Sequence, residues 1–157
     1  MDDAAIARAL HVLGVVLWIG GVGFVTTVLL PAIRRGKRPE ERLAFFEAIE
    51  GRFGWQARGT TLLVGLSGLY LLVSWDLWHR FADPGYWWMH AMVLVWLVFT
   101  IMLALLEPLF LHRWLRHRAA RQPETTFRTI ERLHWFLLAI SLVTVFGAVA
   151  GSHGAGF

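Results

Sequence analysis

The sequence predicts an all-α integral membrane protein that folds as a four-helix bundle. Three observations support this prediction: long uncharged stretches, a high hydrophobic content and an uneven distribution of basic residues. The uncharged stretches contain 17 to 25 residues without Asp, Glu, Lys or Arg, and they cover residues 9–33, 59–75, 84–106 and 133–157. A helix needs about 20 mostly apolar residues to cross the hydrocarbon core of a bilayer. We therefore extend the shortest stretch to about Trp78 and expect a single transmembrane domain over residues 1–157.

Composition and charge agree with this fold class. Hydrophobic residues make up 57% of the chain, with nine Trp and eleven Phe, which fits a lipid-facing surface better than a soluble core. Thirteen of the fifteen Lys and Arg lie in residues 34–58 or 113–132. Basic loops remain in the cytoplasm, so both termini are expected on the outer side of the inner (plasma) membrane. These basic residues lie beside helix ends, which indicates a lipid bilayer as the partner and argues against nucleic acid.

The first helix is expected to begin near Asp3, whose carboxylate complements the helix N-terminus, and to end at Pro31, which lacks an amide hydrogen. No basic leader precedes it, so we expect it to be retained as an anchor. Residues 40–53 then interleave apolar and charged side chains, which predicts a short amphipathic helix at the inner interface.

The second helix carries Gly65 and Gly68 beside Ser67, a small-residue surface on which another helix can pack closely. An outer loop rich in Trp and Tyr resembles an aromatic belt at the membrane surface. The third helix is expected to run to about Leu111, and the fourth from near Thr125 to about Ser152.

Polar side chains inside these spans are the site candidates, because such residues are costly in lipid and are functional by default. They are His11, His90, Glu107 and His134. On the third helix, Met92 falls on the same broad face as Glu107, and a carboxylate should point into the bundle. His90 lies about 200° from Met92, so these two residues cannot readily serve one site. His90 can instead reach the lipid headgroups.

His134 lies close in depth to Glu107, near the inner boundary, so the two can pair across the third and fourth helices. A structural pair is favoured over a proton relay. Arg58, at the inner start of the second helix, is the competing partner for Glu107.

His11 lies near the depth of Met92, since both are offset by about 10 Å from the outer surface at 1.5 Å per residue. An imidazole is a common haem iron ligand, and a thioether can supply the opposite one. Gly14, together with Gly65 and Gly68, would give a macrocycle room, and Trp18 shares the face of His11. A hydrogen bond from His11 to Ser67, Thr61 or a backbone carbonyl is an equally weighted alternative, and ordinary packing is favoured for Met92.

Copper is a second possible chemistry, because thioether and imidazole groups together suit Cu(I). The Met and His residues toward the outer side are Met1, His11, His79, Met89, His90, Met92 and His153. They form no tight Met-x-x-Met or His-x-His cluster. The absence of cysteine excludes disulfides and thiolate metal sites, and no hydrolase or phosphate-binding motif stands out.

Three motifs resemble those of a known family. Leu10-His11 with Trp18-Ile19-Gly20-Gly21 and Leu30-Pro31 is similar to the first helix of the CopD/HemJ-like membrane proteins, which include copper-resistance D-type domains and HemJ-type protoporphyrinogen oxidases. The run from Trp87 to Leu94 resembles their third-helix motif Trp-Leu-His-Ala-Lys-Leu, with Met92 in place of the lysine. Arg52-Phe53 and Ser67-Gly68-Leu69-Tyr70 resemble the copper-resistance branch.

The resemblance implies a four-helix membrane bundle in which His11 serves haem b, as in the HemJ-type proteins. The missing lysine argues against conversion of protoporphyrinogen, because a neutral thioether neither carries that charge nor exchanges protons. A thioether can still ligate iron or copper.

Together these observations predict a haem b-binding protein of the inner membrane with an electron-transfer or oxidoreductase role. His11 is the expected first ligand, with Met92 or His90 as the second. Copper transport or resistance of the CopD type is the first alternative, and a structural subunit of a membrane complex is the second. A membrane redox partner or a homo-oligomer is the expected protein partner, and whether the chain is an enzyme stays open.

Overall fold

The computed structural model describes residues 3–153 and, for residue 112, the backbone alone. Within these residues the chain is helical and contains no β-strand. Four segments are long and apolar enough to cross a membrane, namely Asp3–Gly36, Pro39–Ser74, Pro84–Leu111 and Pro123–Ser152. The predicted all-α fold with four membrane-spanning helices is therefore confirmed by length and composition.

The first span consists of α1 (Asp3–Phe24), the π-helical segment η1 (Val25–Leu29) and α2 (Leu30–Gly36). Our prediction that this helix ends at Pro31 was wrong, because the proline lies in the first turn of α2 and the helix continues beyond it. A proline is tolerated in a first turn, where its missing N–H costs no hydrogen bond. The preceding π-helical turn provides this new start, and the Leu30 N–H accordingly donates to the Val25 carbonyl, five residues back.

The second span is one helix, α3 (Pro39–Ser74), which also contains the segment that we expected to form a separate amphipathic helix. Leu43 and Phe46 of that segment are buried, so its apolar face packs against protein. Gly54 and Gly59 do not interrupt α3, because an interior glycine costs only about 1 kcal/mol and buried neighbours offset it. With 36 residues, α3 is about 54 Å long, well beyond the ~30 Å hydrocarbon core.

A connection of two 3₁₀ turns follows, η2 (Leu77–Ala82) and η3 (Pro84–Tyr86). Asp76, which precedes η2, has a left-handed backbone at φ 49°, and the Asp83 carboxylate accepts the Gly85 N–H at 2.8 Å. The third span is α4 (Trp87–Ile101) with the π-helical segment η4 (Met102–Leu111), which ends where the sequence predicted. After α5 (His112–Arg121), the last span α6 (Pro123–Ser152) begins two residues before the predicted start.

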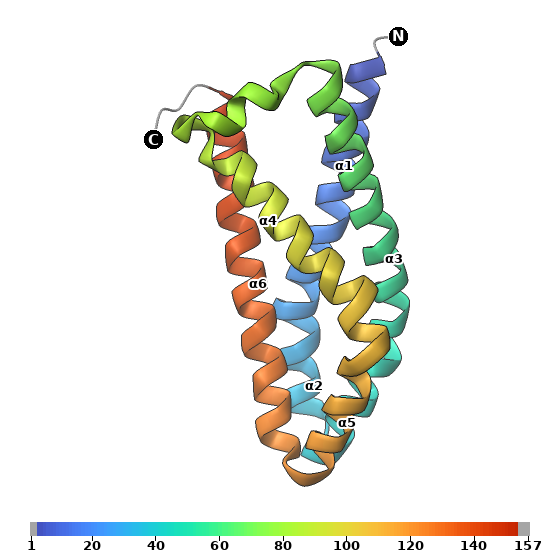
Figure 1. The fold of residues 1–157 in the computed structure, drawn as a ribbon. Coiled ribbons are helices and arrows are strands. Elements are labelled where there is room, and N and C mark those ends of the chain that lie inside the picture. The colour runs from blue at the N-terminus through green and yellow to red at the C-terminus, as the bar shows by residue number, and fades with distance from the viewer. Residues whose placement is uncertain (1–2, 154–157) are drawn as a thin grey trace.

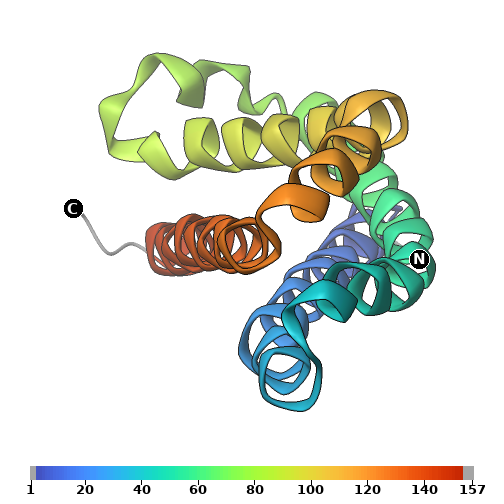
Figure 2. The ribbon, with the colours of Figure 1, turned by 90° about the horizontal axis from the view of Figure 1, so that it is seen from below.

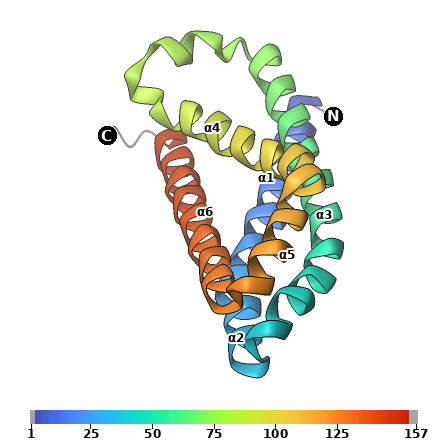
Figure 3. The same cartoon turned by 60° about the horizontal axis from the view of Figure 1, so that its bottom comes forward.

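The helices form an up-and-down bundle in which α1 begins and α6 ends at the same end (Figure 1). We call this the terminal end, and we call the opposite end, which contains α2 and α5, the basic end. At the terminal end, α1 packs along α3 and α4 packs along α6, while α4 crosses obliquely toward the lower half of α3 (Figures 1 and 3). The view from the basic end shows α1 and α3 running side by side (Figure 2).

The interior contains two apolar clusters. The central cluster consists of Trp18, Ile19, Val22, Val64, Val95, Phe99, Leu137 and Leu138. In it, the Trp18 ring meets the Phe99 ring edge-on, with centroids 4.9 Å apart. The second cluster, at the basic end, consists of Val25, Leu30, Ile33, Leu43, Phe46, Leu115, Phe127 and Ile130. Each cluster draws side chains from at least three helical segments, so packing between helices holds the bundle together.

The outer surface of the spans is apolar. Val16, Leu62, Leu94 and Phe146 are each at least 60% exposed, one on each span. An exposed apolar surface of this extent marks contact with lipid or with another protein. The helices therefore indicate a lipid bilayer environment.

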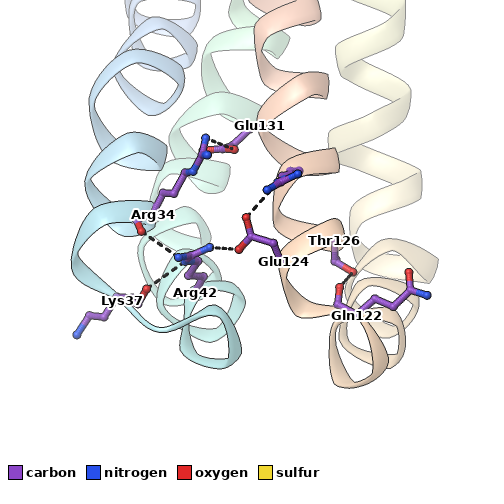
Figure 4. A network of polar contacts seen from close by, with 8 residues as sticks. Arg34, Lys37, Arg42, Gln122, Glu124, Thr126 and Glu131 are labelled. Atoms are coloured by element: carbon purple, nitrogen blue, oxygen red, sulfur yellow. Dashed lines mark hydrogen bonds and ion pairs between the residues drawn. The ribbon is translucent and has the colours of Figure 1, made fainter.

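Ion pairs connect the helices at the basic end (Figure 4). Arg42 of α3 pairs with Glu124 of α6 and donates to the carbonyls of Arg34 and Lys37, each at 3.0 Å. These carbonyls lie at the end of α2, so Arg42 satisfies acceptors that a helix C-terminus leaves free. Arg34 also lies 3.6 Å from Glu131. The network thus joins α2, α3 and α6 beyond the apolar clusters.

Candidate functional site

His11 forms a hydrogen-bonded contact between α1 and α3. Its Nδ1 lies 3.1 Å from the Val64 carbonyl oxygen and 3.1 Å from Ser67 Oγ. A carbonyl can only accept, so Nδ1 carries the hydrogen and Nε2 keeps its lone pair. The ring also lies against the α3 backbone, since a Cβ added to Gly68 would be 3.1 Å from His11 Cε1. The structure thus shows the hydrogen bond that the sequence offered as an alternative. Nε2, the second ring nitrogen of His11, does not take part in that bond.

The glycines expected to make room for a macrocycle serve helix packing instead. A Cβ on Gly14 would lie 2.8 Å from Val64 Cγ2, and one on Gly65 would lie 2.6 Å from Trp96 Cζ2. Trp96 Nε1 also donates to the Thr61 carbonyl at 2.9 Å, which fixes the indole over Gly65. A flat ligand on His11 would therefore not occupy the space beside these glycines.

The two residues expected to supply a second ligand lie on another helix pair. Met92 is partly buried on α4, and His90 is exposed, with its ring edge-on to Phe81 at a centroid distance of 5.1 Å. His11 belongs to the α1–α3 pair, which diverges from α4 at the terminal end. No hydrogen bond or ring contact joins His11 to either residue in the described part of the chain.

In the described residues, the outer Met and His side chains lie in different surroundings. Met89 is buried, with 4% of its surface exposed, and Met1 lies outside the described residues. His79 and His153 hydrogen bond to carbonyls of their own turns, at 2.8 Å in each case. Among the described side chains, no three His, Asp or Glu residues lie close enough to hold a metal ion.

Glu107 is buried and faces α3. Its Oε2 lies 3.3 Å from Arg58 Nη2, and an added Cβ on Gly54 would lie 3.3 Å from its Oε1. Gly54 therefore lets the carboxylate approach the α3 backbone. Of the two partners that the sequence offered for Glu107, Arg58 is the one that forms an ion pair with it.

Arg58 makes a second bond, from Nε to the Leu103 carbonyl at 3.0 Å. In a π-helix this carbonyl would accept the N–H five residues ahead, but that residue is Pro108, which has none. Arg58 thus satisfies an acceptor that the proline leaves free.

His134 contacts different groups. Its Nδ1 donates to the Ile130 carbonyl at 2.9 Å, and its ring stands edge-on to Phe46 with centroids 5.7 Å apart. As in His11, the bond to a carbonyl leaves Nε2 with a lone pair. In the described structure His134 and Glu107 form no ion pair with each other, but both line the same cavity.

The cavity has a volume of about 40 Å³ and lies between α1, α3, α4, η4 and α6. Its polar lining consists of Trp18, Glu50, Glu107 and His134, among apolar side chains that include Phe53 and Phe99. Trp18 is 4% exposed, and its indole Nε1 is buried without a hydrogen-bond partner in the described structure. The sequence placed Trp18 on the same helix face as His11, and in the structure Trp18 lines this cavity.

Glu50 is the site residue that sequence reasoning missed. We assigned it to an interfacial helix, whose charged residues would face water. Because α3 is continuous, Glu50 falls on the same face as the buried residues Leu43, Phe46, Gly54 and Ala57. If this helical periodicity had been followed past the glycines, it would have placed Glu50 on the buried face.

Comparisons of the chain with protein-family models, with curated proteins and with solved structures gave no match. The resemblance to the CopD/HemJ-like proteins therefore rests on the motifs around His11, Met92 and Ser67. The arrangement itself offers two places for chemistry, namely the imidazole of His11 and the polar cavity around Glu107.

Proposed function

We propose that this chain is a haem b-binding protein of the inner membrane that transfers electrons or oxidises a small substrate. The observation that carries the proposal is the bond from His11 Nδ1 to the Val64 carbonyl. Imidazoles that bind metal through one nitrogen commonly donate the other N–H to a carbonyl, which fixes the ring and its tautomer. His11 has this arrangement inside an apolar bundle.

His11, together with a methionine, would hold haem b, and the haem would supply one-electron chemistry there. Met92 is the better second ligand than His90, because Met92 is partly buried whereas His90 is exposed. The resemblance to HemJ-type proteins supports the same role for His11. The absence of their lysine directs the proposal toward electron transfer.

The proposed topology follows from the charges. With the two basic segments in the cytoplasm, both termini and the loop of η2 and η3 lie outside. The first turns of α3 then lie at the inner interface, where their exposed charged side chains contact headgroups and water. His11 lies in the outer half of the bundle under this topology.

A difference spectrum tests the proposal. Protein purified in mild detergent from haem-replete cells is expected to give a reduced-minus-oxidised haem b spectrum, and His11→Ala is expected to lose it because the iron loses its anchor. His79→Ala is the matched control at the same end, and it should leave the spectrum unchanged. A colourless, correctly folded wild-type protein would contradict the proposal.

Metal analysis of the same sample addresses the copper alternative of the CopD type. Iron in the stoichiometry of the haem supports the proposal, while copper without iron would favour copper handling. A stoichiometric partner that co-purifies with a haem-free chain would favour a structural subunit.

A further inference from the structure

We propose that the cavity between Trp18, Glu50, Glu107 and His134 is a hydrated proton-binding site in which Glu50 holds an exchangeable proton. The inference does not rest on haem binding at His11, because the cavity lies deeper in the bundle and uses other side chains. The ligand that its chemistry would take is a proton together with water.

Water is needed in the cavity because two of its lining side chains bring acceptor atoms that have no donor in the described structure. Glu50 brings carboxyl oxygens, and His134 brings Nε2, which keeps its lone pair because Nδ1 donates to Ile130. The unpartnered Nε1 of Trp18 supplies one N–H donor from the lining. A buried N–H without a partner is destabilising, so a molecule that accepts from it and donates to the acceptors stabilises the site.

The volume agrees with this requirement. A cavity needs roughly 10–15 Å³ to hold one water molecule, and this one has about 40 Å³. A buried water typically makes about three hydrogen bonds. The four polar side chains on different walls provide them, whereas a purely apolar cavity of this size would remain dry.

The charges around Glu50 favour a proton on its carboxyl group. Glu107, from η4, lines the same cavity as Glu50, and Glu47 lies three residues earlier on α3, so two further carboxyl groups lie close to it. The nearby cations are engaged elsewhere, since Arg58 pairs with Glu107 and Arg116 pairs with Glu47 at 2.9 Å. From α6 the facing group is His134, and the lining contribution of α1 carries no charge. In the described structure no cation pairs with Glu50, so protonation is the way to relieve the repulsion.

The proton can move between two lining groups. When the O–H bond of Glu50 breaks, a cavity water accepts the proton and passes one on, and an N–H bond forms at His134 Nε2. The products are a carboxylate and an imidazolium, so atoms and charge balance. A site of this kind supplies or takes up the proton that accompanies an electron-transfer or transport step in the membrane.

Infrared spectroscopy of the whole protein in lipid tests the inference. The wild type is expected to show a carboxylic-acid C=O band at neutral pH, where exposed carboxyl groups are ionised, and Glu50→Gln is expected to lose this band completely. Glu40→Gln is the matched control, because Glu40 is exposed on the same helix and should leave the band unchanged. The absence of the band from the wild type, or its loss in Glu107→Gln but not in Glu50→Gln, would overturn the assignment.

Two further measurements test the water. Transfer to D₂O is expected to shift the band, because the proton exchanges through cavity water; a band that does not shift would mean a dry site and overturn the inference. Trp18→Phe keeps an aromatic ring and removes the N–H donor, so it should shift the band without abolishing it. Should Glu50→Gln fail to fold, the wild-type band, its D₂O shift and a moved band in Glu50→Asp still decide the question.

Discussion

Arg58 shows how one side chain can compensate for two local defects. Pro108 leaves the Leu103 carbonyl without its donor, and Glu107 places a carboxylate in an apolar interior. The Arg58 guanidinium contacts both groups: Nε donates a hydrogen bond to the carbonyl, and Nη2 forms an ion pair with the carboxylate. Its planar fork of N–H donors suits such a divided role, which a lysine ammonium would fill less well.

Arg58→Met is therefore expected to destabilise the protein by about 3 kcal/mol, because it removes the guanidinium from a buried carboxylate and from the Leu103 carbonyl. The double variant Arg58→Met with Glu107→Gln should recover part of that loss, since it also removes the buried charge. Thermal unfolding in detergent, followed by loss of the monodisperse peak, measures both. Arg35→Met, on the exposed side of α2, is the control, and an equal effect there would contradict the role of Arg58.

At the scale of the helices, glycines decide how closely the spans approach. Gly65 allows the Trp96 indole to lie on α3, from where its N–H reaches the Thr61 carbonyl. In lipid such contacts matter more than apolar burial, because the bilayer is as apolar as the helix surface. Gly59 on the same helix faces open space, so the two glycines form a natural comparison.

Gly65→Ala is expected to cost about 1–3 kcal/mol, because the new methyl group displaces Trp96 and breaks its hydrogen bond. Gly59→Ala should be neutral or slightly stabilising, as alanine is the better helix former. Comparing the two melting temperatures in the same detergent checks the prediction. Equal melting temperatures would show that Trp96 does not depend on Gly65.

At the scale of the whole molecule, the bundle differs between its two ends. The basic end is closed by an apolar cluster and by the ion pairs of Arg42 and Arg34 (Figure 4). At the terminal end, the α1–α3 and α4–α6 pairs diverge (Figure 1). The charge asymmetry of the sequence thus coincides with an asymmetry of packing.

Cysteine labelling tests the orientation directly, because the chain contains no cysteine of its own. Ala82→Cys in η2 and Ala120→Cys in α5 are both exposed positions at opposite ends. A membrane-impermeant maleimide is expected to label the first in intact cells and the second only after permeabilisation, because basic segments stay in the cytoplasm. The reverse pattern would overturn the proposed topology.

The sequence alone determined the number of spans, the class of fold and the ends of the later helices. Hydropathy is a local property, so each uncharged stretch reports its own span regardless of what it packs against. Sequence rules for single residues failed at two places. At Pro31 the helix continues, because a π-helical turn precedes the proline. At Gly54 α3 also continues, and the glycine leaves room for the Glu107 carboxylate.

Only the tertiary structure decided which polar groups meet. His11 hydrogen bonds to α3, and Glu107 forms an ion pair with Arg58. Glu50 and Trp18 joined His134 at one cavity, although they lie on three different spans. Depth along a helix can be counted from the sequence, but the neighbour on each face depends on how the helices pack, and that arrangement is set by contacts between distant residues.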